Sequence, residues 1–206
     1  MLLDFDKLYE KYNMKINGVI QIGAHYGQEH HIYKNKGVEK IVYFEPLKKN
    51  FEILNNNVGK DSICFNMALG NENRDVEMFV ESANNGMSSS VLKPDLHTQQ
   101  YPHITFDSKE LVKMSKLDDV DFDFSNHNFI NIDVQGYEIE VFKGSTNILK
   151  NIDYIISEVN RESLYENCTM VWALDEFLSE YGFERVETEW IGGNWGDALY
   201  VKKSND

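Results

Sequence analysis

The chain has 206 residues, of which 42% are hydrophobic and 26% charged, values that suit a single globular domain, 1–206, with a proper core. A formal net charge of −14, with no basic cluster longer than Lys48-Lys49 or Lys202-Lys203, disfavours nucleic acid as a partner. No run approaches the roughly 18 apolar residues of a membrane span, and residues 1–12 lack signal-peptide features, so we expect a cytoplasmic protein.

The first half of the chain alternates helix-like and strand-like segments. A helix is predicted over residues 1–15, followed by three apolar runs typical of buried parallel strands at 18–24, 40–46 and 62–69. Helix-like segments separate these runs at 30–37 and 47–57. Such alternation predicts an α/β fold, with helices on both faces of a mostly parallel sheet.

The turn after the first strand has a glycine pattern that suits a nucleotide-like ligand. Gly23 and Gly27 form GxxxG, and glycine lets backbone N–H groups approach a ligand closely. The phosphate-binding motif GxxxxGK(S/T) is absent, and the dinucleotide pattern GxGxxG fails because His25 stands at its third position. Glu45 ends the second strand, where a carboxylate can accept hydrogen bonds from both hydroxyls of a ribose, and Pro46 suits the first turn of the next helix.

The second half begins with an irregular segment and ends in a hairpin. Residues 84–103 hold two of the three prolines and little periodicity, so we expect a long loop or lid. Strand-like runs follow at 128–134 and 153–159, with a helix predicted between them at 137–150. Another helix is predicted over 170–183, and the alternating segments 183–190 and 197–203 predict an antiparallel hairpin that ends the sheet.

Seven stretches, taken in order, resemble the FkbM family of S-adenosylmethionine-dependent methyltransferases. They are IQIGAHYGQE, YFEPLKKNFEILNNN, NMALGNE, SKLDD, FINIDVQGYEIEVFKGS, ISEVN and GDALYVKK, within about residues 16–203. DVQGYE followed by Lys143-Gly144 is the most specific block, and FEP is the next. The resemblance implies a Rossmann-like class I methyltransferase fold of seven strands with a reversed last strand. One departure is Gln21, where relatives often carry an acid; an amide accepts a hydrogen bond from an ammonium but lacks the charge.

The resemblance also implies a site for S-adenosylmethionine and its product, S-adenosylhomocysteine. The loop after the first strand should wrap the methionine half, Glu45 should hold the ribose, and the end of the third strand should meet adenine. Asn66, at that end, has an alternative role as an amide that caps its own backbone. The expected cofactor-binding residues are Gln21, Gly23, Ala24, His25, Gly27, Glu45, Pro46, Asn66, Ala68, Asp133 and Gln135.

Two acids are predicted to be catalytic. Asp133 and Glu158 end the strands 128–134 and 153–159, so both should project from the ligand-binding edge of the sheet. An N-cap for the helix that follows is the alternative for Asp133. A carboxylate here can take the proton of an acceptor hydroxyl. The two acids also offer oxygen ligands for a divalent metal, but no paired-acid motif requires one, and we predict no metal site.

Two pairs of residues have open roles. His97 and His103 lie in the segment 84–103, where each is either a base or a polar loop residue. Trp190 and Trp195 flank the terminal turn and suit either the apolar face of a sugar ring or core packing.

The function that we predict is O-methylation of a sugar hydroxyl on a glycan or glycosylated metabolite, an acceptor that the family implies and the composition does not show. One alternative is an NAD-dependent oxidoreductase, because Glu45 suits NAD equally well, although GxGxxG is missing. The other is a non-catalytic S-adenosylmethionine-binding module attached to glycan synthesis, to which only Gln21 points. The expected partner is a small-molecule or glycan acceptor.

Overall fold

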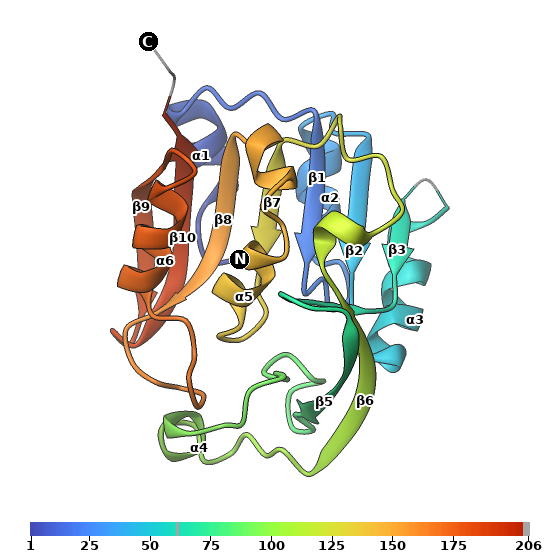
Figure 1. The fold of residues 1–206 in the computed structure, drawn as a ribbon, viewed down its shortest axis with the longest axis vertical. Coiled ribbons are helices and arrows are strands. Elements are labelled where there is room, and N and C mark those ends of the chain that lie inside the picture. Colours follow the sequence, from blue (N-terminus) through green and yellow to red (C-terminus); the bar gives the residue numbers. More distant parts are fainter. Residues whose placement is uncertain (61, 204–206) are drawn as a thin grey trace.

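The main sheet is built from the buried runs predicted from the sequence. The computed structural model describes residues 1–60 and 62–203. Within these residues, seven strands form one sheet in the order β3-β2-β1-β7-β8-β10-β9 (Figure 1). The strands are β1 (Gly18–Ile22), β2 (Lys40–Phe44), β3 (Ile63–Phe65), β7 (Phe129–Ile132), β8 (Tyr154–Asn160), β9 (Phe183–Ile191) and β10 (Trp195–Lys202).

One strand of this sheet is reversed. β10 runs antiparallel to its neighbours β8 and β9, whereas the other neighbouring pairs are parallel. The central strands β1 and β7 are buried at every position, as expected of parallel strands that are covered on both faces. This arrangement confirms the predicted α/β, Rossmann-like fold of seven strands with an antiparallel C-terminal hairpin.

Helices cover both faces of the sheet (Figure 1). On one face Leu8, Tyr33 and Leu54 join a core cluster, and on the other Phe142 and Leu174 join a second cluster. No helix in the described part of the chain is long and apolar enough to cross a membrane. The helices are α1 (Phe5–Lys11), α2 (His30–Asn35), α3 (Lys48–Val58), α4 (Leu96–Gln100), α5 (Glu138–Lys143) and α6 (Val171–Ser179), with short 3-10 helices η1 (Leu117–Asp119) and η2 (Ile148–Asn151).

The strand expected at 62–69 is divided between two sheets. β3 ends at Phe65, and β4 (Ala68–Leu69) joins a smaller sheet, in the order β4-β6-β5, with β5 (Arg74–Val80) and β6 (Ser108–Ser115). The division falls at Asn66, whose Nδ2 donates to the carbonyl oxygens of Glu45 and Pro46, each at 2.9 Å. The small sheet lies against the lower end of the main sheet in Figure 1. Sequence reasoning did not anticipate it.

Two predicted helices are shorter than expected. The N-terminal helix covers only residues 5–11, and the backbone N–H of Lys7 donates to Asp4 at its N-cap. The helix expected at 137–150 divides into α5 and η2 at Gly144. An added Cβ at Gly144 would lie 1.9 Å from the carbonyl oxygen of Gly70, so the chain after β4 passes directly against this position. Packing between the two segments therefore coincides with the interruption.

The segment 84–103, hereafter the lid segment, is mostly irregular and includes α4. Within it, Ser90 pairs with Phe79 of β5, and Pro94 pairs with Tyr165. The lid segment is therefore attached to the small sheet and to the connection after β8. In Figure 1 it lies below the end of the main sheet at which β1 and β2 end.

The ends of β1 and β7 approach so closely that only glycine fits between them. Gly23 has φ +75°, and an added Cβ would lie 1.8 Å from the carbonyl oxygen of Asp133. The N–H of Asp133 donates to the carbonyl oxygen of Ile22 at 3.0 Å, which holds the two exits together. Gly37 has a similar φ, +77°, but an added Cβ there meets no atom within 4 Å.

We expect Gly23→Ala to be much more destabilising than Gly37→Ala. Gly37→Ala should lower the free energy of unfolding by about 1–2 kcal/mol, the cost of a left-handed conformation for an L-residue. Gly23→Ala carries the same cost and adds about 1–3 kcal/mol for the clash. Urea unfolding of both variants measures the difference. If both variants lose the same free energy of unfolding, the chain segments after β1 and β7 can move apart without cost.

Candidate active site

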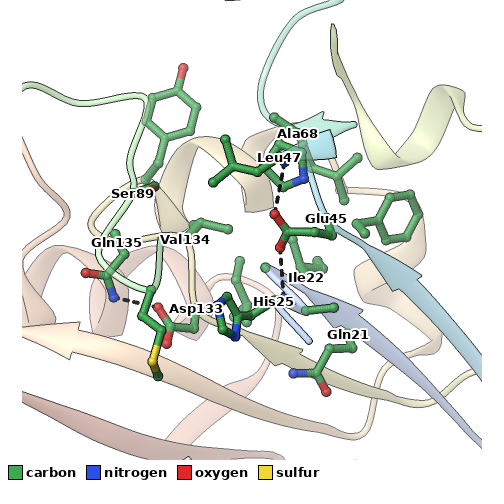
Figure 2. Close-up of a pocket in the computed structure, with 18 of the residues that line it drawn as sticks. Gln21, Ile22, His25, Glu45, Leu47, Ala68, Ser89, Asp133, Val134 and Gln135 are labelled. Atoms are coloured by element: carbon green, nitrogen blue, oxygen red, sulfur yellow. Dashed lines mark hydrogen bonds between the residues drawn. The ribbon is translucent and has the colours of Figure 1, made fainter. Parts of the chain in front are cut away.

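A cavity of about 370 Å³ opens at the carboxyl ends of β1, β2 and β7 (Figure 2). Its volume falls in the range of about 300–1,000 Å³ that is usual for small-molecule sites. The chain leaves β1 towards β2 on one side, and β7 lies on the other side, so the cavity is at a topological switch point of the sheet. This space is hereafter the first cavity.

Glu45 lies in the first cavity directly after β2. Its Oε2 accepts the backbone N–H of His25 at 2.8 Å, and its Oε1 accepts that of Leu47 at 2.9 Å (Figure 2). Burial nevertheless raises the pKa of Glu45 to about 8. Each carboxylate oxygen can accept more than one hydrogen bond, so Glu45 can also receive both hydroxyls of a vicinal diol.

The glycine loop is fastened to its surroundings by its backbone and by one histidine. The N–H groups of Gly23 and Ala24 both donate to the carbonyl oxygen of Phe44 at 3.0 Å, so they hold β2. The Nε2 of His25 lies 3.0 Å from the carbonyl oxygen of Asn85 in the lid segment. Because a carbonyl only accepts, Nε2 is the donor in this contact. The loop and the lid segment are thereby joined across the first cavity.

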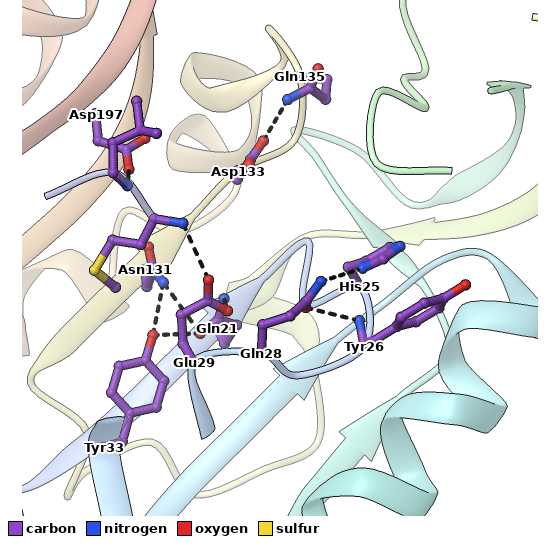
Figure 3. Close-up of polar contacts among 12 residues, drawn as sticks. Gln21, His25, Tyr26, Gln28, Glu29, Tyr33, Asn131, Asp133, Gln135 and Asp197 are labelled. Atoms are coloured by element: carbon purple, nitrogen blue, oxygen red, sulfur yellow. Dashed lines mark hydrogen bonds and ion pairs between the residues drawn. The ribbon is translucent and has the colours of Figure 1, made fainter. Parts of the chain in front are cut away.

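Gln21 belongs to a polar network at the wall of the first cavity (Figure 3). Its Oε1 accepts the hydroxyl of Tyr33 at 2.5 Å, and Asn131 Nδ2 donates to the same hydroxyl at 2.7 Å. The amide of Gln21 donates to Glu29 at 3.3 Å. Both functional ends of Gln21 therefore contact protein groups, and its carbonyl is engaged by Tyr33.

Negative charge beside Gln21 comes from two acids that sequence reasoning missed. Glu29 and Asp197 both line the first cavity. Glu29 contacts the amino group of Met1 at 3.2 Å, and Asp197 accepts the backbone N–H of Leu2. Burial raises the pKa of Asp197 to about 6. Asp197 could have been found from its pairing with Glu158 in the β8–β10 ladder. The sequence alone does not give this pairing, because it depends on the register of the hairpin.

Asp133 and Glu158 are joined by one amide. Asp133 directly follows β7 and is exposed, whereas Glu158 is buried on β8. Gln135 Nε2 donates to Asp133 Oδ1 at 2.8 Å and to Glu158 Oε2 at 2.5 Å (Figure 3 shows the first of these contacts). The expectation that Glu158 ends its strand was wrong, because β8 continues to Asn160 in its ladder with β10.

The electrostatics of the two acids differ. Complete burial raises the pKa of Glu158 well above its usual value, and the charges of Asp133 and Glu138 raise it further. Burial also raises the pKa of Glu138 to about 7, although this carboxyl accepts the N–H groups of Val134 and Gly136. The raised pKa favours the protonated form of Glu158, which can donate a hydrogen bond. Asp133 is exposed, so its carboxyl group is open to contact with a ligand.

A second cavity of about 250 Å³ adjoins the first, and Met87, Asp133 and Gln135 line both. Its other walls come from the lid segment, from β8 and from β10, and include His97, Tyr101, His103, Glu158, Leu164 and Trp195. Trp190 lies elsewhere, with the guanidinium of Arg161 3.7 Å from the centre of its ring. An elongated ligand in the first cavity can therefore present a group to the second beside Asp133.

Two predicted cofactor residues lie outside the lining of the first cavity. Gly27 instead faces α3, where an added Cβ would lie 2.8 Å from both Leu54 Cδ1 and Val58 Cγ1. Asn66 makes the backbone contacts that end β3. The other predicted cofactor residues all line the cavity, namely Gln21, Gly23, Ala24, His25, Glu45, Pro46, Ala68, Asp133 and Gln135. The described residues contain no cluster of three or more His, Cys, Asp or Glu side chains that could hold a metal ion.

The fold is shared with several solved methyltransferases. A TehB-like S-adenosylmethionine-dependent methyltransferase from Corynebacterium glutamicum is 8% identical, with a TM-score of 0.54 over 98% of this chain and 89% of that one. Magnesium protoporphyrin IX methyltransferase from Synechocystis, with bound S-adenosylmethionine, is 8% identical, with a TM-score of 0.54 over 96% and 76%. A putative tRNA methyltransferase from Streptococcus pneumoniae is 10% identical, with a TM-score of 0.54 over 100% and 72%. At these identities the likeness concerns the fold alone.

The family is shown by the sequence itself. Residues 21–185 match the model of the methyltransferase FkbM domain, whereas no curated protein matches the chain. The matched region contains the glycine loop, Glu45, Asp133 and Glu158, so it includes most of the groups that line the two cavities. It also decides between the two nucleoside cofactors that Glu45 alone left open. The chain belongs to the FkbM family and is an S-adenosylmethionine-dependent methyltransferase.

Proposed function

We propose that the protein transfers a methyl group from S-adenosylmethionine to a sugar hydroxyl of a glycan or glycosylated metabolite. The observation that carries this proposal is the junction of the two cavities at Asp133 and Gln135. A methyl donor in the first cavity and a hydroxyl in the second would meet beside an exposed carboxylate there. Positioning of this kind supplies much of the rate of a displacement reaction.

The first cavity has the chemistry that the cofactor needs. Glu45 can receive the ribose hydroxyls, and Pro46 and Ala68 line the part of the cavity beyond β2, where the base would lie. Glu29, Asp133 and Asp197 surround the remainder with carboxyl groups, which suit a ligand that carries a sulfonium and an ammonium. These residues compensate for the missing charge at Gln21.

Methyl transfer also requires that the acceptor hydroxyl lose its proton. The bound cofactor supplies the methyl group: the acceptor oxygen bonds to the methyl carbon as the carbon–sulfur bond breaks, and that electron pair leaves with sulfur. Asp133 takes the hydroxyl proton, and Gln135 holds its carboxylate in place. Burial favours the protonated form of Glu158, which donates a hydrogen bond to an oxygen of the acceptor.

The acceptor that fits best is small and carries no phosphate charge. The net charge of −14 opposes the approach of a polyanion, so we do not extend to this chain the tRNA named for the Streptococcus pneumoniae protein. Aromatic side chains beside carboxyl groups, as in the second cavity, favour a ring with hydroxyls at its edge.

Removal of the Glu45 carboxylate should weaken cofactor binding. At about pH 9, above the pKa of about 8 of Glu45, we expect Glu45→Ala to reduce the affinity for S-adenosylhomocysteine by about 1.5–3 kcal/mol, the usual value of a hydrogen bond to a charged group. Calorimetry provides the measurement. Glu52→Ala is the matched control, because Glu52 is an exposed acid on α3 outside the cavity. Tight binding of NAD and none of S-adenosylhomocysteine would overturn the cofactor site.

The two acids should respond differently to amide substitution. A glycan panel with labelled S-adenosylmethionine first identifies an acceptor. With it, Asp133→Asn should lower kcat by about 10²-fold or more, a far larger effect than its loss of cofactor affinity, because an amide cannot take a proton. Glu158→Gln keeps a hydrogen-bond donor and should mainly raise KM for the acceptor. Wild-type turnover in both variants would exclude the two acids from catalysis. If the protein binds the cofactor but methylates no member of the panel, the non-catalytic module is favoured.

The stability of the ligand-free protein should depend on pH through Glu45. Its pKa of about 8 in the folded state lies above its ordinary value of 4.5, so the folded protein retains a proton that the unfolded chain releases. This stabilisation is complete below about pH 4.5 and is lost as the pH rises to about 8, by up to about 1.4 kcal/mol per pH unit. Glu45→Gln should flatten this slope in urea unfolding measured across that interval. If the free energy of unfolding of Glu45→Gln falls with pH as steeply as that of the wild type, the titrating group is a residue other than Glu45.

A further inference from the structure

The second cavity is lined by a histidine whose side chain makes no hydrogen bond within the described residues. His97 on α4 is 5% exposed and lies among the rings of Tyr101, Phe106 and Tyr165, with centroids 5.2–5.4 Å away. In the described residues, Nδ1 of His97 is buried without a hydrogen-bond partner. A buried N–H without a partner is costly, so Nδ1 is best left as the unprotonated nitrogen of the ring.

The ring of His97 can meet a ligand through its other nitrogen. His97 lines the second cavity, and its Nδ1 is covered, which leaves Nε2 for contact with a bound molecule. Burial lowers the pKa of His97, so the ring is neutral and has one donor and one acceptor. An orphaned N–H is less well tolerated than an orphaned lone pair, which places the proton on Nε2. His97 is therefore equipped to donate a hydrogen bond to an oxygen in the cavity.

Two further aromatic side chains of the second cavity, Trp195 and Tyr101, are joined by a hydrogen bond. Trp195 Nε1 donates to the hydroxyl of Tyr101 at 3.0 Å. This bond fixes the indole and uses its only donor, so the part of Trp195 that remains for the cavity is apolar. Glu158 and Asp133 contribute oxygen atoms at the end of the cavity that adjoins the first cavity. The second cavity thus combines an apolar surface with polar groups at separate positions.

We propose that the second cavity binds a pyranose ring, with its apolar face against Trp195 and Tyr101, one hydroxyl beside Asp133 and a second hydroxyl on Nε2 of His97. The assignment rests on the proposed methyl transfer and specifies its acceptor. His97 thereby becomes a residue that determines specificity, because an acceptor with only one hydroxyl leaves the Nε2–H of His97 unpaired. Asp133 retains the proton-accepting role.

Saturation-transfer NMR can test this site without knowledge of the natural acceptor. The probes are methyl α-D-glucopyranoside, methyl α-D-mannopyranoside and methyl α-L-fucopyranoside, each added to the full chain with S-adenosylhomocysteine. Cyclohexanol, which has a ring and one hydroxyl, is the control probe. We expect at least one pyranoside to bind and cyclohexanol to bind more weakly. No binding by any pyranoside, or stronger binding by cyclohexanol, would overturn the proposal.

Two variants show where the pyranoside binds. His97→Phe keeps an aromatic ring but has no hydrogen-bond donor, so it should weaken the pyranoside that binds by about five- to tenfold, as for one lost hydrogen bond, and should leave the affinity for S-adenosylhomocysteine unchanged. His127→Phe is the matched control, because His127 is 4% exposed, also has a buried Nδ1 without a partner in the described residues, and lies outside the cavity lining. Equal binding by the wild type and His97→Phe would overturn the role of His97.

A cavity-filling variant keeps the test decisive if His97→Phe does not fold. Ile104 lines the second cavity and is only partly buried, so Ile104→Trp should fill the space and abolish pyranoside binding. Unchanged pyranoside binding in Ile104→Trp would exclude this cavity. The wild type also separates the two proposals. Pyranoside binding by a protein that does not bind S-adenosylhomocysteine would overturn the methyl transfer but retain the sugar site.

Discussion

The close approach of two backbones at the carboxyl edge of the sheet is the constraint on which the site depends. The carbonyl oxygen of Asp133 occupies the space where a side chain at Gly23 would begin. From this contact the chain after β1 turns towards β2, whereas the chain after β7 turns towards β8, so the two loops diverge. The first cavity is the space that they leave between them. Asp133 is placed by its backbone, and its carboxylate is therefore left exposed at the junction of the two cavities.

Charge is distributed in this site in a way that favours a cationic ligand. Glu45, Asp197 and Glu158 are buried, and burial raises the pKa of each one. Among the described residues, no lysine or arginine lines either cavity, and the positive group at the first cavity is the amino group of Met1, which contacts Glu29. The cost of desolvating the acids is reduced when a ligand brings positive charge or hydroxyl donors. The methyl donor has both, which gives a physical reason for the acids along these two cavities.

The site residues that could be predicted from the sequence are those that directly follow an apolar, strand-like run. Gly23, Glu45 and Asp133 each stand next to a short apolar run, and the order of the runs places their ends at one edge of the sheet. Residues that depend on distant pairing could not be found in this way. Glu29 and Asp197 reach the same cavity from opposite ends of the chain, and β4 joins β6, which begins about 40 residues later. The division of the run 62–69 between two sheets has the same cause, because β4, its second half, pairs with a strand that is distant in the sequence.

The two tryptophans show how register alone decides a role. Trp195 pairs with Ile191 and Trp190 pairs with Gly196, so the two side chains occupy neighbouring positions in the hairpin and point to opposite faces. Only Trp195 lines the second cavity. A shift of one residue in this hairpin would exchange the two faces, and the sequence pattern does not determine which register forms.

Gln135 links the acids to the lid segment through a conformation that few residues adopt. Its φ is +55°, in the left-handed region that glycine favours. A glycine would relieve the backbone but would remove the amide that donates to both Asp133 and Glu158. The oxygen of the same amide lies 2.8 Å from the hydroxyl of Tyr165, which also lies 2.8 Å from the carbonyl oxygen of Ser88 in the lid segment. One side chain therefore sets the spacing of the acids and, through a single hydroxyl, ties that spacing to the segment that forms the wall of the second cavity.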